Sequence, residues 1–540
     1  MIDPVLHVER DASLSAQDNS AGKVAFTGAK MGDLYLAIDV GTGGLRAALV
    51  DRFGKILAYA HQEHEQIVPQ FSWSEQRPMD WWTGTITSIR NVLERIPNAA
   101  TRVAAICTCG QMHGTVLVDA LGQLTLDAVP LWNDKRTVAQ VDAFKKRVSQ
   151  ETSLSLAANI PAPAWPAFKL MWIKENHPDA FSRTRHVLMP KDWINFKLTG
   201  AFAQDYTEAS LSFLMDWKTR EWSDTLCELT GVPRSILPKL RQSYDVLDGL
   251  SREAAELLGL TEGIPVLVGA GDYPMALLGS GVIATGMGSD VTGTSSIITI
   301  LRDDIILDDE AANVLMPNGK WGVMTLVDAG GDAIRWARRA LHDNTLSYDD
   351  IEESAAKAPA GSNSLFFLPY LSGERVAQMP NSRAQYFGLK AEHTMHDLHR
   401  AVMEGVAFSV RLKLDKLADG NAKPDRIVAA SGGAKSSLWL NIKASLYNVP
   451  YVMTQEAECG VIGAAMTMAY SLGDYRNFED AAKAMVHYTD EIKPDPKWVE
   501  RYDKMMSIYA RLYDHSKSFY DDLDQLDGWN SAHSQEQGNG

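Results

Sequence analysis

The chain has 540 residues, of which 45% are hydrophobic and 22% are charged. This is the composition of a globular protein, and the length exceeds one ordinary hydrophobic core, so we expect two domains. The formal net charge of −16 excludes a nucleic-acid backbone or an anionic membrane surface as the main partner, and any phosphate site must therefore be local.

The two ends of the chain are polar. Residues 1–32 lack the apolar core of a signal peptide, and residues 516–540 end in a polar run, so we expect a disordered extension and a flexible tail. The most apolar stretch, residues 264–283, is interrupted by Asp272 and several glycines, so no segment is expected to span a membrane. Four scattered cysteines are too few for a disulfide framework, which favours a reducing cytoplasm.

Residues 34–54 are predicted to form two short strands joined by a glycine-rich turn, because apolar residues alternate on both sides of it. Gly41 and Gly43 would let backbone N–H groups approach an anion, and Thr42 adds a hydroxyl donor. Asp39 could hold a divalent cation directly or through water. A hairpin turn of this composition also occurs without a ligand, so the turn alone leaves both interpretations open.

Two commoner nucleotide loops are excluded here. A Walker loop requires Lys followed by Ser or Thr after its last glycine, but Leu45 and Arg46 follow this one. A Rossmann turn opens a helix, whereas this turn leads into a second strand. What remains is a phosphate-binding hairpin of the actin and sugar-kinase type.

A third strand is predicted near residues 55–61, a helix from Pro78, and a buried strand over residues 102–108 that leads into the sequence GQMHG. Ligand sites of α/β proteins tend to lie at that end of a strand. His113 could bond a substrate hydroxyl there, with Met112 in the wall of the site. The alternative is an ordinary core histidine, and the pattern does not decide between the two.

Residues 150–260 are predicted to be mostly helical. The polar residues Lys191, Asp192 and Asp205 lie in this region. We expect them to cap helices and to form ion pairs at the surface.

The apolar run from Pro265 to Gly271 is predicted to be a buried strand, and Asp272 follows it directly. That position can orient a carboxylate and tune its pKa for general-base work. Further along, Gly293, Thr294 and Ser295 repeat the Gly-Thr turn between two strand-like segments. Two such hairpins facing each other would hold a phosphate chain from both halves of the protein.

Residues 427–434 are predicted to form a buried strand that ends in Ser-Gly-Gly-Ala before a helix. Gly432 and Gly433, with Ala434, would let a flat ring such as adenine lie over the backbone. The alternative is a tight strand-to-helix turn without a ligand.

Together these stretches resemble the FGGY family of carbohydrate kinases, and the similarity extends from Leu34 to Tyr513. Both signature regions of the family are matched, at residues 166–176 and 384–404. The segments closest to the members that phosphorylate D-xylulose are residues 73–76, 110–114, 131–134, 188–192 and 368–375.

The resemblance implies an α/β fold with two ribonuclease-H-like domains of the actin and sugar-kinase superfamily. Residues 33–275 would bind the sugar and residues 276–515 the nucleotide, with closure about the connection near Asp272. It implies an ATP-dependent kinase that converts a ketopentose, D-xylulose first, to its 5-phosphate, and a homodimer by analogy. The alternatives are another ketose or a polyol, such as ribulose, L-xylulose or erythritol, and a sugar-binding regulator without catalysis.

By resemblance, Asp272 is the general base that accepts the proton of the sugar hydroxyl, and Asp39 organises Mg²⁺ through water with Asp272 beside it. Gly41 to Gly43 and Gly293 to Ser295 hold the phosphates of ATP, and Gly432 to Ala434 border the adenine. The sugar pocket is lined by Met112, His113, Asp272 and Tyr273.

The chain departs from the family pattern at three places. Tyr273 stands where the members specific for D-xylulose have an Asn that touches the sugar, so the choice of sugar is open. Ser431 replaces a third glycine of the adenine loop. In the next helix, Asn441 and the segment Lys443–Ser445 stand where Gln and Ala-Asp are usual, so nucleotide affinity is expected to differ.

Overall fold

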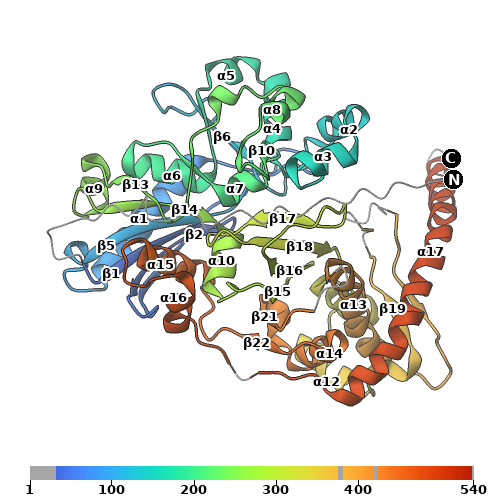
Figure 1. Ribbon diagram of the computed structural model, residues 1–540. Helices are drawn as coiled ribbons and strands as arrows, with labels where there is room; N and C mark the ends of the chain where they lie inside the picture. Colours follow the sequence, from blue (N-terminus) through green and yellow to red (C-terminus); the bar gives the residue numbers. More distant parts are fainter. Residues whose placement is uncertain (1–31, 372, 375–380, 419–422, 490, 538–540) are drawn as a thin grey trace, which may run out of the picture.

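The computed structural model describes residues 32–371, 373–374, 381–418, 423–489 and 491–537. Within them the chain forms two six-stranded mixed sheets with helices around both (Figure 1). This is the predicted α/β architecture. The predicted N-terminal extension, residues 1–32, lies outside the described residues apart from Gly32, and so does Arg375 at the end of the segment 368–375.

The first sheet is built on the predicted hairpin. The strand β1 pairs antiparallel with β2, in a register that runs from Leu34 opposite Asp51 to Val40 opposite Leu45, and parallel with β5. Its strand order is β13-β14-β5-β1-β2-β3. The strands are β1 Leu34–Val40, β2 Gly44–Asp51, β3 Ile56–Glu63, β5 Val103–Gly110, β13 Val246–Gly249 and β14 Pro265–Gly271.

The second sheet repeats this plan, in the order β17-β18-β16-β15-β21-β22. Its first strand, β15, pairs antiparallel with β16 and parallel with β21, as β1 does with β2 and β5. The predicted repetition of the strand-turn-strand unit is therefore confirmed. The strands are β15 Met287–Thr292, β16 Ser296–Arg302, β17 Ala312–Leu315, β18 Trp321–Val327, β21 Arg426–Ala430 and β22 Tyr451–Met453.

Both faces of the first sheet are covered, which explains why its strands are almost wholly apolar. On one face, Leu36 and Ile38 pack with α1 (Pro78–Glu94), α6 (Pro190–Thr199) and α9 (Arg252–Leu258). On the other face, Tyr35 and Ala37 pack with three helices from later in the chain. These are α10 Asp272–Gly279, α15 Cys459–Ser471 and α16 Phe478–Met485.

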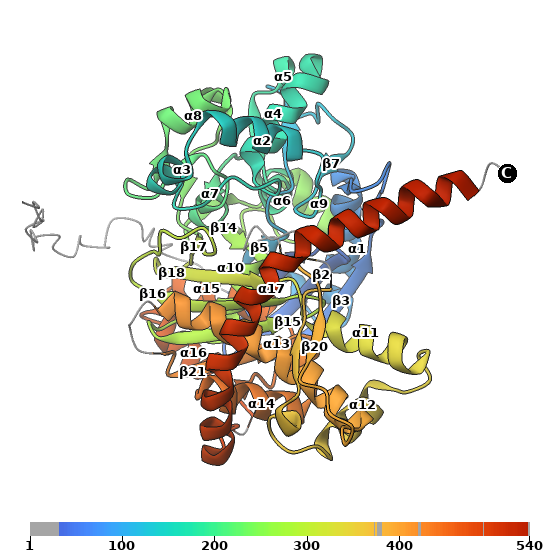
Figure 2. The same ribbon diagram turned by 90° about the vertical axis from the view of Figure 1, so that its right-hand side faces the viewer.

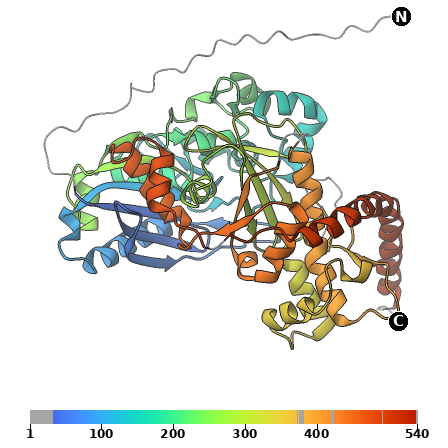
Figure 3. The same cartoon turned by 60° about the horizontal axis from the view of Figure 1, so that its bottom comes forward.

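The helices α15 and α16 thus lie against the first sheet although they follow the second one in sequence (Figures 1 and 3). The two sheets do not divide the chain at a single residue, and the predicted boundary between residues 275 and 276 falls inside α10. A local sequence pattern does not reveal such a return of the chain, because the contacts join residues far apart in sequence.

The second sheet is also covered on both faces. Leu277 of α10 packs with Leu301 and Val428 on one face. On the other face lie α13 (Met395–Ala418) and α14 (Ser437–Tyr447). The helix α11 (Gly331–His342) follows β18, and α12 (Tyr348–Ala356) follows it.

The region predicted to be mostly helical carries several short helices and short two-stranded pairs. Among these pairs, β6 (Val116–Val118) joins β8 (His186–Leu188). Besides α6 and α9, the helices of this region are α3 Gln150–Ala157, α4 Pro166–Asn176, α5 Pro178–Arg183, α7 Tyr206–Ser210 and α8 Asp224–Thr230, and α2 Val138–Arg147 precedes it.

The chain ends in a single long helix, α17 (Pro496–Gln537), which crosses the molecule and extends beyond it (Figure 2). Tyr502, Tyr509, Tyr513 and Tyr520 are buried and recur at helical spacing. The prediction of a flexible tail from residue 516 is therefore wrong at least as far as Tyr520. No helix in the described part of the chain is both long and apolar enough to cross a membrane.

Candidate active site

Three loops meet at one edge of the first sheet. In register, Val40 of β1 lies beside Gly110 of β5, and Gly110 lies beside Gly271 of β14. The Gln111 backbone N–H also donates to the Val40 carbonyl at 2.8 Å. The residues that follow these strands therefore share one edge, where the carboxyl ends of parallel strands commonly form a site.

The glycine-rich turn after β1 is held by side chains from outside it. His64 Nε2 lies 2.8 Å from the Gly41 carbonyl oxygen, and Gln76 Nε2 donates to the Thr42 carbonyl at 2.7 Å. Trp132 Nε1 donates to Thr42 Oγ1 at 3.0 Å. Because the Thr42 hydroxyl accepts from Trp132, its own proton remains available for a phosphate oxygen.

The two glycines of this turn, Gly41 and Gly43, have different surroundings. A Cβ on Gly41 would lie 2.5 Å from Arg46 Nη1, so a side chain there would disturb that guanidinium. At Gly43, by contrast, no heavy atom lies within 4 Å of the Cβ position. Open space over exposed backbone is what the approach of an anion requires.

Asp39, near the end of β1, has one bonded and one orphaned oxygen. Its Oδ2 accepts from Arg46 Nη1 at 3.1 Å, and Arg46 Nε lies 3.6 Å from Glu458. Burial raises the pKa of Asp39, Arg46 lowers it, and Glu458 raises it again. Asp39 Oδ1 is buried and has no hydrogen-bond partner among the described residues. A buried, unpartnered carboxylate oxygen suits a water or a hydrated cation.

Asp272 opens α10 directly after β14, as predicted. One of its oxygens, Oδ1, accepts from the backbone N–H of Tyr273 at 2.7 Å. Burial raises the pKa of Asp272 to about 7, and the negative charge of Asp39 adds to the shift. A carboxylate tuned close to neutral pH has the basicity that general-base catalysis requires.

His113 follows β5 and its ring packs edge-on against Trp165, with 5.1 Å between ring centroids. Its backbone N–H donates to Glu208 Oε2 at 3.4 Å, and its carbonyl accepts from Lys169 Nζ at 2.7 Å. Burial and Lys169 hold the pKa of His113 well below its usual range, so the ring is neutral at pH 7. His113 Nδ1 and Glu208 Oε1 are buried without a partner among the described residues, which suits the hydroxyl groups of a ligand.

Met112 connects this pocket to Asp272. A Cβ on Gly271 would lie 2.7 Å from Met112 Cγ, so the methionine packs directly on the residue before Asp272. The structure thus places Met112 against the residue before Asp272, and a shared sugar pocket of Met112, His113 and Asp272 stays a prediction.

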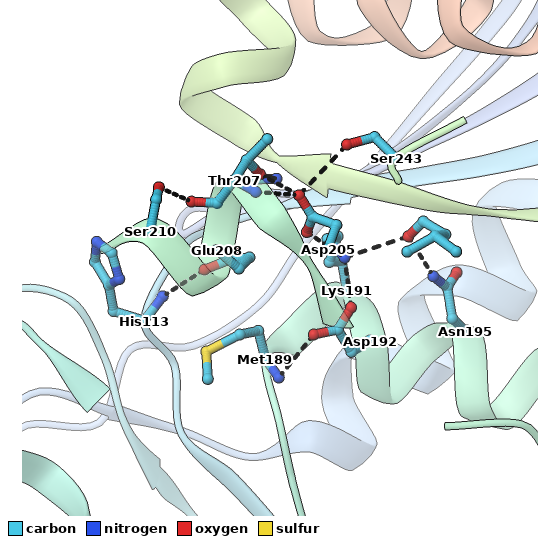
Figure 4. Close-up of polar contacts among 12 residues, drawn as sticks. His113, Met189, Lys191, Asp192, Asn195, Asp205, Thr207, Glu208, Ser210 and Ser243 are labelled. Atoms are coloured by element: carbon cyan, nitrogen blue, oxygen red, sulfur yellow. Dashed lines mark hydrogen bonds and ion pairs between the residues drawn. The ribbon is translucent and has the colours of Figure 1, made fainter. Parts of the chain in front are cut away.

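A buried charge network lies behind these residues (Figure 4). Lys191 Nζ contacts Asp192 and lies 2.9 Å from Asp205 Oδ1, and all three side chains are buried. The prediction of surface ion pairs is therefore wrong, whereas the predicted capping roles of Asp192 and Asp205 are confirmed. Local sequence could not show the burial, because it comes from the strand β14 packed above these helices.

This network holds β14, the strand that directly precedes Asp272. Lys191 Nζ donates to the Val268 carbonyl at 3.2 Å, and the Gly271 N–H donates to Thr207 Oγ1 at 2.9 Å. Thr207 is in turn bonded to Asp205. Sequence reasoning missed this support, although the spacing Lys-Asp followed by Asp-x-Thr was visible.

Tyr273 faces the second sheet. Its hydroxyl lies 2.5 Å from Thr299 Oγ1 in β16, and its ring packs with the cluster of Leu277 and Val428. Adjacent residues of a helix point in different directions, so Tyr273 does not share the side of Asp272. The Tyr273 hydroxyl is thus bonded within the protein, and the place of Tyr273 in the sugar pocket stays a prediction.

The second predicted phosphate turn lies between β15 and β16 and rests on the start of α11. The Gly293 carbonyl accepts from the Gly331 N–H at 2.8 Å, and the Thr294 carbonyl accepts from the Asp332 N–H at 3.2 Å. Arg335 Nη2 donates to Thr294 Oγ1 at 3.4 Å. The turn is thus fixed to α11, which also carries the positively charged side chain of Arg335.

A cavity of about 430 Å³ opens beside this turn. This cavity was not predicted, although the sequence offers a usable signal: Gly330-Gly331 is followed by Asp332 and by two arginines at helical spacing. Four of its lining residues belong to α11 and the fifth follows β19 (Phe366–Leu368): Asp332, Arg335, Trp336, Arg339 and Leu371.

The predicted adenine loop adjoins the same turn. A Cβ on Gly433 would lie 2.7 Å from Thr292 Cβ, and one on Gly293 would lie 3.5 Å from Ser431 Oγ. Ser431 has φ 69° and ψ −162°, a backbone conformation that favours glycine. Gly432 has no neighbour within 4 Å of its Cβ position, and Ala434 donates its N–H to the Ser431 carbonyl.

The predicted site residues thus form two groups, one on each sheet. In the part of the chain that the structure describes, no cluster of three or more His, Cys, Asp or Glu side chains could hold a metal ion. A cation at Asp39 and Asp272 would therefore take most of its ligands from water and phosphate, which is how Mg²⁺ is usually bound.

Known proteins resemble the chain over most of its length. The profile of the FGGY family of carbohydrate kinases matches in two parts, its N-terminal domain at residues 34–279 and its C-terminal domain at residues 289–472. Xylulose kinase of Bacillus subtilis is 28% identical over 486 residues, which cover 89% of this chain and 97% of that protein.

Two solved structures have the same fold. Xylulose kinase from Rhodospirillum rubrum superposes with a TM-score of 0.86 at 27% identity, over 90% of this chain and 99% of that one. Gluconate kinase from Lactobacillus acidophilus superposes with a TM-score of 0.85 at 26% identity, over 91% of this chain and 100% of that one.

Proposed function

The chain belongs to the FGGY family of carbohydrate kinases, and we propose that it transfers the γ-phosphoryl group of ATP to D-xylulose, forming D-xylulose 5-phosphate. The similarity to xylulose kinases over most of the chain supports this substrate. Asp272, tuned to a pKa of about 7 at the edge that it shares with Asp39 and His113, is the observation that carries the proposal.

On the sugar side, His113 and Glu208 offer buried polar atoms to the hydroxyl groups of the ketose, and Met112 packs against the apolar face. Asp272 accepts the proton of the attacking sugar hydroxyl. The hydroxyl oxygen can then bond to the γ-phosphorus while the bond between that phosphorus and the ADP oxygen breaks. Asp272 gains that proton, and the product leaves as a phosphate ester.

On the nucleotide side, we assign the phosphates to the two Gly-Thr turns, Gly41–Gly43 and Gly293–Ser295. Gly432, Gly433 and Ala434 then border the adenine. The cavity beside Arg335 adjoins the second turn and has room for part of the nucleotide. In this assignment residues 33–275 bind mainly sugar and residues 276–515 mainly nucleotide.

Mg²⁺ is the cofactor we propose, held by Asp39 through water with Asp272 nearby. The orphaned Asp39 Oδ1 fits this role, because it needs a donor or a cation that the described protein residues do not supply. When bound, the ion would neutralise charge on the phosphates. We also propose a cytoplasmic homodimer without nucleic-acid or membrane partners, which is consistent with four free cysteines and a net charge of −16.

The test is ADP release from Mg-ATP with one acceptor at a time. The panel comprises D-xylulose, L-xylulose, D-ribulose, L-ribulose, erythritol, glycerol, D-gluconate and a control without sugar. We expect D-xylulose to give the highest kcat/KM, and no stimulation by any acceptor in Asp272→Asn. D-Gluconate belongs in the panel because the gluconate kinase is structurally as similar as the xylulose kinase.

A preference for another acceptor would retain the kinase activity and replace D-xylulose as substrate. Hydrolysis of ATP that no acceptor stimulates would overturn the proposal. Omitting Mg²⁺, with EDTA present, is expected to abolish ADP release, and adding Mg²⁺ back should restore it.

A further inference from the structure

A buried polar network lies directly beneath the second phosphate turn. Lys443 Nζ of α14 donates to Asp290 Oδ2 at 2.8 Å and to Thr292 Oγ1 at 2.7 Å. Tyr451 of β22 donates its hydroxyl proton to the same Asp290 oxygen at 2.9 Å. Thr292 Oγ1 lies 2.6 Å from Asp290 Oδ1 and 3.2 Å from Ser296 Oγ. The network therefore joins β15, β16, β22 and α14.

The members of this network are shielded from water. The side chains of Lys443 and Asp290 are each 1% exposed, and the Lys443 ammonium also lies 4.6 Å from the centre of the Trp439 ring. Taking two charges out of water costs free energy that an apolar pair would not cost. A buried pair of this kind is weak support for overall stability, so another use of the pair has to be sought.

Its position indicates such a use. Thr292 and Ser296 are the residues on either side of the turn Gly293–Ser295, and the network binds both hydroxyl groups. Thr292 is also the residue on which Gly433 of the adenine loop packs, since a Cβ there would lie 2.7 Å from Thr292 Cβ. One threonine thus connects the phosphate turn to the adenine loop.

We propose that Lys443 and Asp290 are positioning residues for the nucleotide, which hold Thr292 so that the phosphate turn and the adenine loop keep a fixed spacing. Neither charged group touches the nucleotide in this account. Both act through Thr292, whose hydroxyl is fixed by the lysine on one side and by the aspartate on the other. The inference rests on the nucleotide role proposed for these two loops.

The test separates nucleotide affinity from sugar affinity. We compare the wild type with Lys443→Met, with Asp290→Asn and with the double variant, measuring KM for ATP, KM for the best acceptor, and mant-ADP binding by fluorescence. We expect KM for ATP and the mant-ADP Kd to rise about tenfold or more, because a binding loop displaced by about 1 Å can cost up to about a hundredfold. The KM for the sugar should stay within about twofold, because His113 and Asp272 belong to the other sheet.

A matched control comes from a second buried ion pair in the same half of the protein. Arg400 Nε lies 2.7 Å from Glu404 Oε1, and Tyr502 donates to the same oxygen at 2.7 Å. Like the network, this pair is almost fully buried, but it does not contact either loop. The double variant Arg400→Met with Glu404→Gln should lower the melting temperature and leave the KM for ATP unchanged.

Removal of a buried lysine can prevent folding, so Thr292→Val serves as a second variant. Thr292→Val keeps the side-chain volume and the Lys443–Asp290 pair and removes only the hydroxyl, so it should weaken nucleotide binding. Thr292→Ser keeps the hydroxyl and should bind the nucleotide as tightly as the wild type. Equal ATP affinities in all variants, with a lower melting temperature alone, would overturn the positioning role. Failure of the wild type to release ADP with any acceptor would instead reject the kinase proposal, and mant-ADP binding would still report on the loops.

Discussion

At the scale of single residues, the role proposed for Asp272 as general base predicts how the activity depends on pH. Burial and the charge of Asp39 raise the pKa of Asp272 to about 7, and Arg46 opposes the shift. Only the deprotonated carboxylate accepts a proton, so kcat/KM for the sugar should rise about tenfold per pH unit below pH 7 and become level above it.

The variant Arg46→Met checks the sign of this argument. Loss of a positive charge near Asp272 raises its pKa further, so the acidic limb of the kcat/KM profile should move to higher pH. A limb that stays in place, or that moves to lower pH, would contradict the assignment of Asp272 as the group that titrates.

Tyr273 illustrates a residue whose contacts could not be predicted from its neighbour. The sequence pattern indicates contact with the sugar, whereas the hydroxyl bonds Thr299 on the second sheet. We therefore expect Tyr273→Phe to lower the free energy of unfolding by about 1 kcal/mol, the usual value of one hydrogen bond, and to leave the KM for the sugar unchanged. Urea denaturation and steady-state kinetics measure the two effects. A rise in sugar KM of tenfold or more would return Tyr273 to the sugar pocket.

Ser431 is another departure whose meaning becomes physical in the structure. Its φ of 69° and ψ of −162° belong to a region that residues with a Cβ rarely adopt. The variant Ser431→Gly should therefore raise the free energy of unfolding by about 1 kcal/mol, measured by urea denaturation, because it relieves this strain. The matched variant Ser431→Ala keeps the Cβ and should give no gain. An equal gain in both would show that the backbone is not strained.

At the scale of elements, α10 and α15 cross at glycines. A Cβ on Gly463 would lie 2.0 Å from the Met275 carbonyl oxygen, and one on Gly279 would lie 1.8 Å from the Cys459 carbonyl oxygen. These are backbone atoms and cannot rotate away, so the helices would have to separate. Because α10 starts at Asp272 and α15 starts beside Asp39, their spacing also sets the spacing of the two carboxylates.

The variant Gly463→Ala should therefore destabilise the protein by about 2 kcal/mol or more, and lower kcat by up to about a hundredfold through the misplacement of Asp272. The matched variant is Gly84→Ala in α1, where the nearest atom lies 3.5 Å from the Cβ position. Alanine there should stabilise the helix by about 0.5–1 kcal/mol. Similar urea midpoints for both variants would show that the α10–α15 contact adapts.

The elements that the sequence predicts well are those with a strong local period. The alternation of β1 and β2 and the apolar run of β14 needed no knowledge of their neighbours. The packing of α15 on the first sheet could not be predicted without knowledge of its neighbours, because only the fold brings residues 459–471 next to β1. The burial of Lys191 and Asp205 has the same origin, and so does the contact of Tyr273 with the second sheet.

At the scale of the whole molecule, the proposed site is divided between two similar sheets. Asp39, His113 and Asp272 lie on the first sheet, and the turn Gly293–Ser295 and the adenine loop lie on the second. The duplicated hairpin was predictable because each copy has its own pattern. The arrangement of the copies depends on long-range contacts through α10 and α15, which only the folded structure supplies.

A divided site predicts that sugar and nucleotide stabilise the protein cooperatively. Each ligand alone should raise the free energy of unfolding, by about 2.7 kcal/mol when its concentration is a hundred times its Kd. The melting temperature should rise accordingly. Each also favours the arrangement in which the two sheets meet around both ligands, so the second should bind more tightly after the first, with a coupling of about 1–3 kcal/mol.

Asp272→Asn allows the measurement with ATP itself, because it removes the base and keeps the shape of the side chain. D-Xylulose and Mg-ATP together should then raise the melting temperature by more than the sum of their separate shifts. Isothermal titration should give the same coupling in either order of addition, as linkage requires. Strictly additive shifts would mean that the two sheets bind their ligands independently, and the closure expected about the connection near Asp272 would then have no part in assembling the site.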